Sequence, residues 1–300
     1  MFAVLFDPIL PVFAILALGF AMGRGGVTSI ADARAINRFA LTIPLPLLVF
    51  GLLADAPIRG FDFVPVAVYA ASQAVVFAAG FLAARRLFGR EPGEALLLAF
   101  SGIFTNNAFF GVPISLLLYG EERMLPITTI VTLDSAVTFA GTIIALQIVG
   151  QGRPDLAAVG RNLVRSPLLI SIVLGMAVSL SGLGLPGPVR TFVDFNGAAA
   201  APVALFAMGV VLSETRFGAD PAVVSFAVVK LAVFPALVAL GLAATVAPGA
   251  ERDMFVLAAA GPAGSMAFNL ALMHGIRTDA LAQVVVWTSL LSLIGLALLA

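Results

Sequence analysis

Long apolar runs separated by short polar breaks follow one another along the whole chain. A helix needs about 20 such residues to cross about 30 Å of hydrocarbon, and these runs are long enough while lacking the alternation of barrel strands. We therefore predict an all-α membrane protein with ten transmembrane helices, or nine or eleven because the seventh run is weak. The runs span residues 8–23, 39–54, 64–84, 95–119, 124–149, 166–185, 198–213, 221–247, 254–274 and 280–300.

Composition places the chain in a bilayer and excludes several classes of function. Hydrophobic residues make up 61% and charged residues 11% of the sequence, against about 45–50% and about 25% in soluble domains. The chain has no cysteine and a single histidine, so we expect no metal and no other cofactor. Nucleotide-binding, hydrolase and nucleic-acid-binding patterns are also missing. The sequence therefore predicts neither an enzyme nor a nucleic-acid-binding protein.

The arginines favour one orientation in the membrane. Loops after odd-numbered runs carry eleven arginines, including Arg216. Loops after even-numbered runs carry four, including Arg59. The positive-inside rule then puts the odd loops in the cytoplasm. We expect a multi-pass protein of the bacterial inner membrane with both termini on the periplasmic side.

Matches between the two halves recur at a constant offset of 156 residues. Gly19 corresponds to Gly175 in this register, and Phe50 corresponds to Phe206. Residues 1–149 and 150–300 then form two five-helix repeats, and an odd number of helices makes the second repeat enter the membrane inverted. Inverted repeats are a recurring architecture of secondary transporters.

The fourth run has polar and helix-breaking residues at its centre. Pro113 lacks a backbone donor and Gly111 weakens the same turn, so we expect the helix to break there. Unpaired backbone groups at membrane depth are tolerated only inside protein or beside a wet cavity. We predict that Gly111 and Pro113, together with the preceding Thr105, Asn106 and Asn107, form part of a site that binds a carboxylate or an ion; packing between helices is the alternative.

The ninth run holds a second break. Pro262, Gly264 and Ser265 do not favour a regular helix, and Asn269 follows one turn later. Two interrupted helices in corresponding positions point to a transporter site, because half-helix N-termini offer free N–H groups to an anion. We predict that these four residues complete the substrate site.

Two charged residues fall inside predicted spans. Asp134 lies in the fifth run among threonines, and Lys230 lies in the eighth. Charges at membrane depth are costly and usually functional, so both are candidates for proton or ion coupling; a structural ion pair, or snorkelling of Lys230 to the interface, is the alternative. We assign Gln73 to helix packing.

The fourth run also carries a family resemblance. Asn106, then Gly111 and Pro113, then Tyr119 and Gly120 at the helix end match a pattern of the auxin efflux carrier family, which includes plant PIN carriers and bacterial malonate and organic-acid permeases. In the ninth run, Pro262 and Gly264 followed by Phe268 resemble the second crossing of that family, and Lys230 with Pro235 is also similar.

The resemblance implies an elevator-type carrier with a fold like that of bile-acid symporters and NhaA, in which the fourth and ninth helices are broken and cross. It implies a scaffold of helices 1, 2, 6 and 7, a transport domain of helices 3–5 and 8–10, and an organic anion bound at the crossing with Asn106 as a ligand. Thr105 and Ala267 stand where plant members have proline, which favours a small carboxylate over auxin itself.

Alternatives to this carrier stay open. A bile-acid-type sodium symporter would share the ten helices, but it predicts an acidic ligand near the second break, and residues 261–269 contain none. A membrane sensor or channel is a third reading. The expected partners are a small organic anion, a proton or sodium ion, and the lipid bilayer, and a homodimer is compatible with the sequence.

Overall fold

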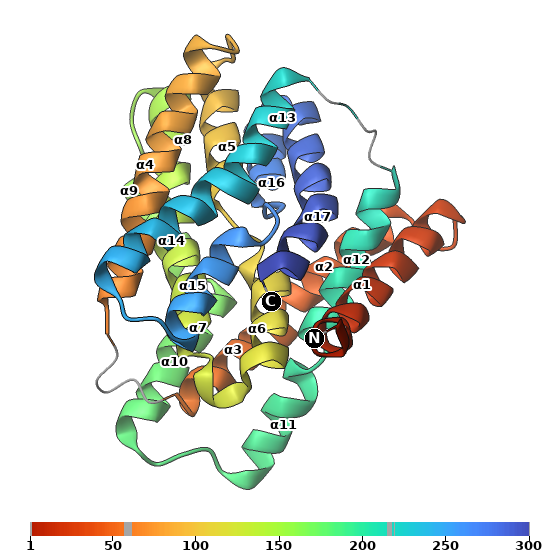
Figure 1. Cartoon of the computed structure of the whole chain (residues 1–300), viewed down its shortest axis with the longest axis vertical. Helices are drawn as coiled ribbons and strands as arrows, with labels where there is room; N and C mark the ends of the chain where they lie inside the picture. Colours follow the sequence, from red (N-terminus) through yellow and green to blue (C-terminus); the bar gives the residue numbers. More distant parts are fainter. Residues whose placement is uncertain (1, 57–61, 215–217, 219, 300) are drawn as a thin grey trace. The chain divides into compact units, whose positions relative to one another are not determined.

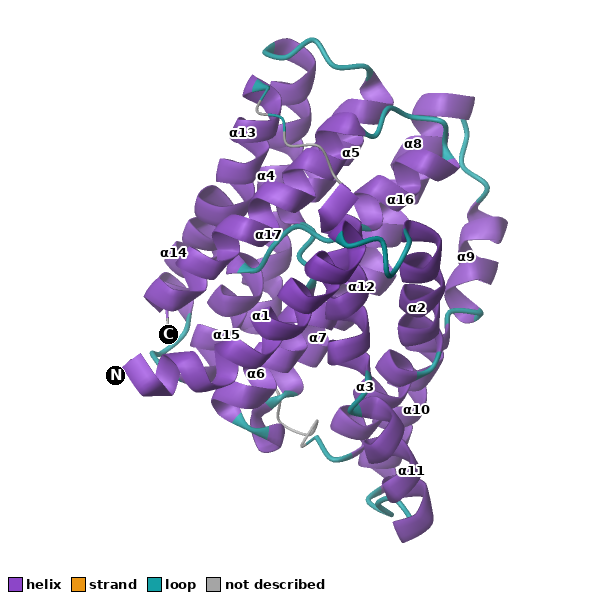
Figure 2. Ribbon diagram, turned by 90° about the vertical axis from the view of Figure 1, so that its right-hand side faces the viewer, coloured by secondary structure: helices purple, strands orange, loops and turns teal. Residues whose placement is uncertain are grey.

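The computed structural model describes residues 2–56, 62–214, 218 and 220–299, and its regular structure is helical throughout. Within those ranges, one antiparallel bridge between Thr105 and Ala263 is the only β-type pairing, and Figure 2 shows helices joined by loops. The all-α fold class is therefore confirmed. Arg59 and Arg216, which enter the charge count, lie outside the described residues.

Several helices are long and apolar enough to cross a membrane. The described residues contain five of them, at Ile30–Ala54, Val64–Arg86, Leu125–Gly150, Gly187–Glu214 and Pro221–Thr245, or six if Leu156–Val164 and Pro167–Ser181 form one interrupted span. The chain is thus a multi-pass membrane protein. Several other predicted spans are divided into shorter helices, so the count of ten stays a prediction.

The chain folds into two compact units. Unit 1 comprises Met1–Phe61, Ala108–Thr132 and Val164–Thr215. Its helices are α1 (Phe2–Arg24), α2 (Ile30–Thr42), α3 (Pro44–Ala54), α6 (Val112–Tyr119), most of α7 (Leu125–Leu133), α10 (Pro167–Ser181), α11 (Gly187–Gly197) and α12 (Ala200–Glu214), with the short turn η2 (Glu121–Arg123).

Glycines let two helix pairs of unit 1 approach closely. A Cβ atom on Gly19 of α1 would lie 2.1 Å from the carbonyl oxygen of Phe206 in α12, and one on Gly175 of α10 would lie 2.8 Å from that of Phe50 in α3. Small residues are the usual means by which membrane helices pack backbone to backbone. The two contacts interchange when each residue is replaced by its partner at the offset of 156.

Unit 2 comprises Asp62–Asn107, Leu133–Leu163 and Arg216–Ala300. Inside it, α4 lies against α5 and α14, and α13 lies against α17 (Figure 1). Its helices are α4 (Val64–Arg86), α5 (Pro92–Ile103), α8 (Phe139–Gln151), most of α9 (Leu156–Val164), α13 (Pro221–Val228), α14 (Phe234–Thr245), α15 (Ala250–Ala260), α16 (Met266–Met273) and α17 (Asp279–Leu299).

Three turns of π-helix interrupt the α-helices, at η1 (Asn107–Gly111), η3 (Asp134–Thr138) and η4 (Val229–Val233). Each contains one buried amide or charged side chain, namely Asn107, Asp134 or Lys230. In η4 the N–H of Phe234 reaches the carbonyl of Val229, five residues back, directly before Pro235. A wider turn relieves the clash that proline makes in a regular helix. Such π turns often mark functional sites.

Candidate functional site

Two extended segments meet inside unit 2. Residues 104–106 follow the end of α5, and residues 261–265 separate α15 from α16. The N–H of Asn106 donates to the carbonyl of Pro262 at 2.9 Å, and the N–H of Gly264 donates to the carbonyl of Phe104 at 2.9 Å. A Cβ on Gly264 would lie 2.8 Å from the ring of Phe104, so glycine permits this approach. Each broken helix thus satisfies backbone groups of the other.

The first break does not lie at Pro113, where we expected it. Phe104 is extended, with ψ of 106°, whereas Pro113 is the second residue of α6 and Gly111 is the N-cap of that helix. Proline is tolerated at the start of a helix because the first N–H groups have no intrahelical partner. Gly111 and Pro113 also fall in unit 1. The second break is where the sequence predicted it, since Pro262 lies between α15 and α16.

Lys230 joins the first extended segment to the end of α15 by side-chain hydrogen bonds. Its side chain is fully buried, and its Nζ donates to Thr105 Oγ1 at 2.7 Å and to the carbonyl of Ala259 at 2.6 Å. Ala259 lies in the last turn of α15, where unpaired carbonyls carry partial negative charge. The ammonium also lies 5.0 Å from the ring centroid of Phe234. Lys230 is therefore a buried cation at the end of a half-helix.

Asp134 is buried beside the same segment. Its carboxylate accepts from Gln73 Nε2 at 2.7 Å and from Asn107 Nδ2 at 3.3 Å, and Thr138 Oγ1 donates to Gln73 Oε1 at 3.1 Å. The ion pairs of the described residues include none between Asp134 and Lys230. The two charges instead act on each other through space. Both are tied to residues 105–107.

Two buried polar atoms at this place make no hydrogen bond. The Tyr69 hydroxyl lies near the side chains of Thr105 and Asn107, and its ring packs on Phe234 with the centroids 5.3 Å apart. Neither the Tyr69 hydroxyl nor Asn107 Oδ1 has a hydrogen-bond partner. Buried polar groups are almost always paired in native proteins. An unpaired donor near Thr105, to which Lys230 donates, is therefore a candidate contact for a ligand with acceptor oxygens.

The other predicted site residues are spread along the two crossing helices. Asn106 is half-buried and Pro262 and Gly264 are buried, whereas Ser265 is exposed and Asn269 is half-buried in α16. Groups of acidic and histidine side chains able to hold a metal ion are absent from the described residues.

Sequence reasoning missed two members of the site. Gln73 was expected to pack between helices, but it donates to Asp134, and Tyr69 was not considered. Both are buried on one face of α4, four residues apart. Polar side chains at this spacing on an otherwise apolar helix were the signal that could have found them.

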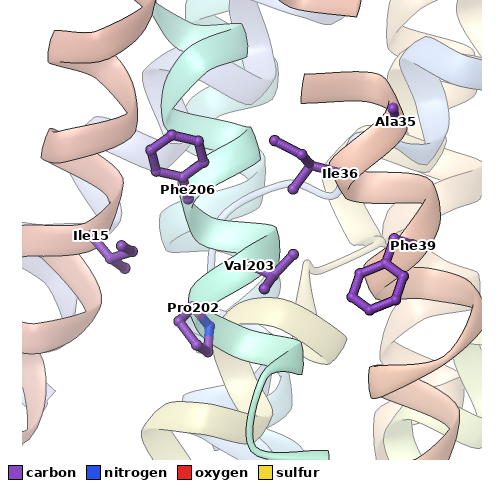
Figure 3. Close-up of a pocket in the computed structure, with 7 residues that line it drawn as sticks. All are labelled: Ile15, Ala35, Ile36, Phe39, Pro202, Val203 and Phe206. Carbon is purple, nitrogen blue, oxygen red and sulfur yellow. The ribbon is translucent and has the colours of Figure 1, made fainter. Parts of the chain in front are cut away.

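A separate apolar groove lies in unit 1. It has a volume of about 600 Å³ and is lined by Ile15, Ala35, Ile36, Phe39, Pro202, Val203 and Phe206, which come from α1, α2 and α12 (Figure 3). None of these side chains can donate a hydrogen bond or carry charge. The groove therefore does not suit an anion, and the crossing in unit 2 is the better candidate.

The chain is similar to known membrane transport proteins over almost its whole length. The model of the family described as "Membrane transport protein" matches residues 4–153 and 155–300. A protein of Rhizobium meliloti (strain 1021) named "Putative malonate transporter" is 29% identical over 95% of this chain and 91% of its own. An uncharacterized transporter of Methanothermobacter thermautotrophicus is 26% identical over 97% of this chain and 96% of its own.

Proposed function

Because the chain belongs to the Membrane transport protein family, which is the auxin efflux carrier family, we propose that it is a secondary carrier for a small organic anion. The family and the names of the relatives identify a membrane transporter rather than an enzyme. Beyond the family's transport role, we propose a class of substrate and the place where it binds. That place is the crossing of the two broken helices in unit 2.

One observation carries the proposal: a fully buried ammonium and an unpaired buried hydroxyl lie at the paired breaks. Lys230 uses two of its three N–H donors in hydrogen bonds to Thr105 and Ala259. Its third donor and the Tyr69 hydroxyl are suited to the oxygens of a carboxylate, because charge-assisted hydrogen bonds are strong where water is scarce. Asn106 and Asn107 add amide donors beside them.

The charge at the site and the names of the relatives support the proposed substrate class. A single buried cation suits one carboxylate group, which a monocarboxylate, a dicarboxylate or an auxin-like acid can each supply. The Rhizobium meliloti relative has malonate in its name, which favours a short dicarboxylate. A sodium-coupled symporter of the bile-acid type is less favoured, because the described residues hold no group of acidic side chains for a cation.

The inverted repeat and the elevator mechanism belong to the same proposal. The interchange of the Gly19–Phe206 and Gly175–Phe50 contacts at the offset of 156 supports the repeat. Asn106 and Pro262, which hydrogen-bond to each other, are themselves 156 residues apart. The division into two compact units supports a scaffold and a transport domain, with unit 2 as the moving part. The division differs from the expected one in residues 108–132, which are parts of predicted helices 4 and 5 but belong to unit 1. We further propose the bacterial inner membrane, with periplasmic termini.

Counterflow in proteoliposomes tests the function. Vesicles loaded with unlabelled malonate should take up labelled malonate in a saturable way, whereas a channel would give linear flux without counterflow. Asn107→Ala should reduce uptake, while Asn196→Ala should not, because Asn196 lies in α11 and its Nδ2 donates to the Phe192 carbonyl of the same helix. Equal uptake by both variants would remove the crossing as the site. A panel of succinate, lactate and indole-3-acetate would then rank the substrates.

A further inference from the structure

We propose that the bound anion replaces Asp134 as the counter-ion of Lys230, and that Asp134 takes up one proton for each anion bound. The inference rests on the proposed function and deepens it, because it fixes the coupling ion and its stoichiometry. The empty site holds an ammonium and a carboxylate. The loaded site holds an ammonium, a substrate carboxylate and a neutral Asp134.

The charges inside unit 2 favour this exchange. The buried charged side chains of the described residues are Glu94, Asp134 and Lys230, and Glu94 is paired with Arg90 at 3.1 Å. The crossing therefore contains one positive and one negative charge. A substrate carboxylate would make two negative charges against one positive charge, and an uncompensated charge in a dry interior is strongly unfavourable. A proton on Asp134 removes one negative charge, which leaves the site neutral with a monocarboxylate and with one net negative charge with malonate.

The groups around Asp134 leave it as the proton acceptor. Helix α4 presents Gln73 and Tyr69, η1 presents Asn107, and η4 presents Lys230. Tyr69 and Lys230 are the titratable groups that act on Asp134 most directly among the described residues. In this proposal Lys230 remains an ammonium, which donates to Thr105 and Ala259, and the Tyr69 hydroxyl serves the anion as a donor.

Asn107 is arranged to serve both states of Asp134. In the charged state its Nδ2 donates to the carboxylate at 3.3 Å. A protonated Asp134 is itself a donor, and the amide has a free acceptor, because Asn107 Oδ1 has no partner. Turning the amide over would let Oδ1 accept the new O–H. The unpaired oxygen of Asn107 is explained by this second state.

The proton balance of a cycle follows directly. A proton from the side where the anion enters binds Asp134, crosses with the anion, and leaves to the other side on release. A monocarboxylate then moves without net charge. A dicarboxylate such as malonate carries one net negative charge for each proton.

Proton uptake on binding tests this coupling with purified protein. Malonate is added to wild type in a weakly buffered solution containing a pH indicator, from neutral pH upward, where both malonate carboxyls stay ionised. One proton should be taken up for each malonate bound, and Kd should rise about tenfold per pH unit where Asp134 is charged in the empty protein and protonated in the loaded protein. Binding without proton uptake would overturn the inference and leave the proposed function intact. Absence of any bound or exchanged carboxylate would overturn both.

Variants locate the proton. Asp134→Asn mimics the protonated acid, so its Kd should lose the dependence on pH and should be lower than that of wild type at alkaline pH. Asp194→Asn, on the exposed surface of α11, should behave like wild type. Proton uptake that persists in Asp134→Asn would contradict the assignment. So would a loss of anion binding to wild type when choline replaces sodium in the buffer. Where Asp134→Asn does not fold, the proton count in wild type decides.

Discussion

The interiors of the two units use different chemistry. In unit 1 the buried polar side chains of the described residues are all hydroxyls, on Ser115, Thr128, Ser171 and Ser213. Buried amides and charges, at Gln73, Glu94, Asn107, Asp134 and Lys230, are found in unit 2. Unit 1 is held by close backbone packing, which favours rigidity. The buried polar groups of unit 2 reduce its stability, and such groups at membrane depth usually mark functional sites.

The largest expected effect comes from removing the cation of unit 2. Lys230→Met leaves the Ala259 carbonyl and Asp134 without their positive partner, and breaking a buried charge network costs about 3–5 kcal/mol. Malonate affinity should fall by about a hundredfold, or about 2.7 kcal/mol. Thermal unfolding and counterflow measure the two losses. Normal counterflow in folded Lys230→Met protein would show that the ammonium does not bind the anion.

The matching change in unit 1 should affect stability alone. A Cβ on Gly209 would lie 2.0 Å from the carbonyl oxygen of Leu16, so Gly209→Ala must push α12 away from α1, at a cost of about 1–3 kcal/mol. Gly141→Ala is the control, because nothing lies within 4 Å of its added Cβ. The unfolding temperature should fall for Gly209→Ala only, because alanine at Gly141 lies in open space inside α8 and does not weaken that helix. A changed Kd for malonate in that variant would contradict the separation of roles.

Tyr69→Phe separates binding from stability within unit 2. The variant loses one hydrogen bond to a charged ligand, worth about 1.5 kcal/mol, so malonate affinity should fall by about tenfold. Stability should not fall, because the hydroxyl that is removed has no partner. Tyr119→Phe in α6 is the matched control. Unchanged affinity in Tyr69→Phe would place the ligand elsewhere.

The smallest effect is expected at the edge of unit 2. Asp220 caps α13 by accepting from the N–H groups of Ala222 and Val223, and Arg90 also donates to it. Burial raises the pKa of Asp220, but these donors outweigh it and hold the pKa below its usual value. Its contribution is therefore present above the unfolded pKa of about 3.9 and is lost as pH falls through the folded pKa. Asp220→Asn should cost at most about 1 kcal/mol at neutral pH and nothing in acid, as measured by thermal unfolding.

Local sequence signals predicted the all-helical fold and the second break but not the position of the first. Pro262 lies among small residues that cannot continue a helix, so its position was readable. Pro113 was misleading, because proline at a helix start costs little. The true break at residues 104–106 is stabilised by pairing with residues more than 150 positions away. Such long-range pairing is not encoded in any local pattern.

Asp134 and Lys230 could be predicted from the sequence as site residues, whereas Gln73 and Tyr69 could not. Asp134 and Lys230 stood out because charges are rare at membrane depth. Whether they touch was open, and the structure attaches each of them to residues 105–107 rather than to the other. Gln73 and Tyr69 were not recognised, because a single polar side chain in an apolar helix is usually a packing residue. Only the fold brings them to Asp134 and Thr105.

The most direct measurement is an experimental structure of the wild-type protein with malonate bound. A carboxylate within hydrogen-bonding distance of Lys230 Nζ and the Tyr69 hydroxyl, with Asn107 still beside Asp134, is the predicted result. Malonate bound away from the crossing, for example in the groove lined by Phe39 and Phe206, would contradict the central claim.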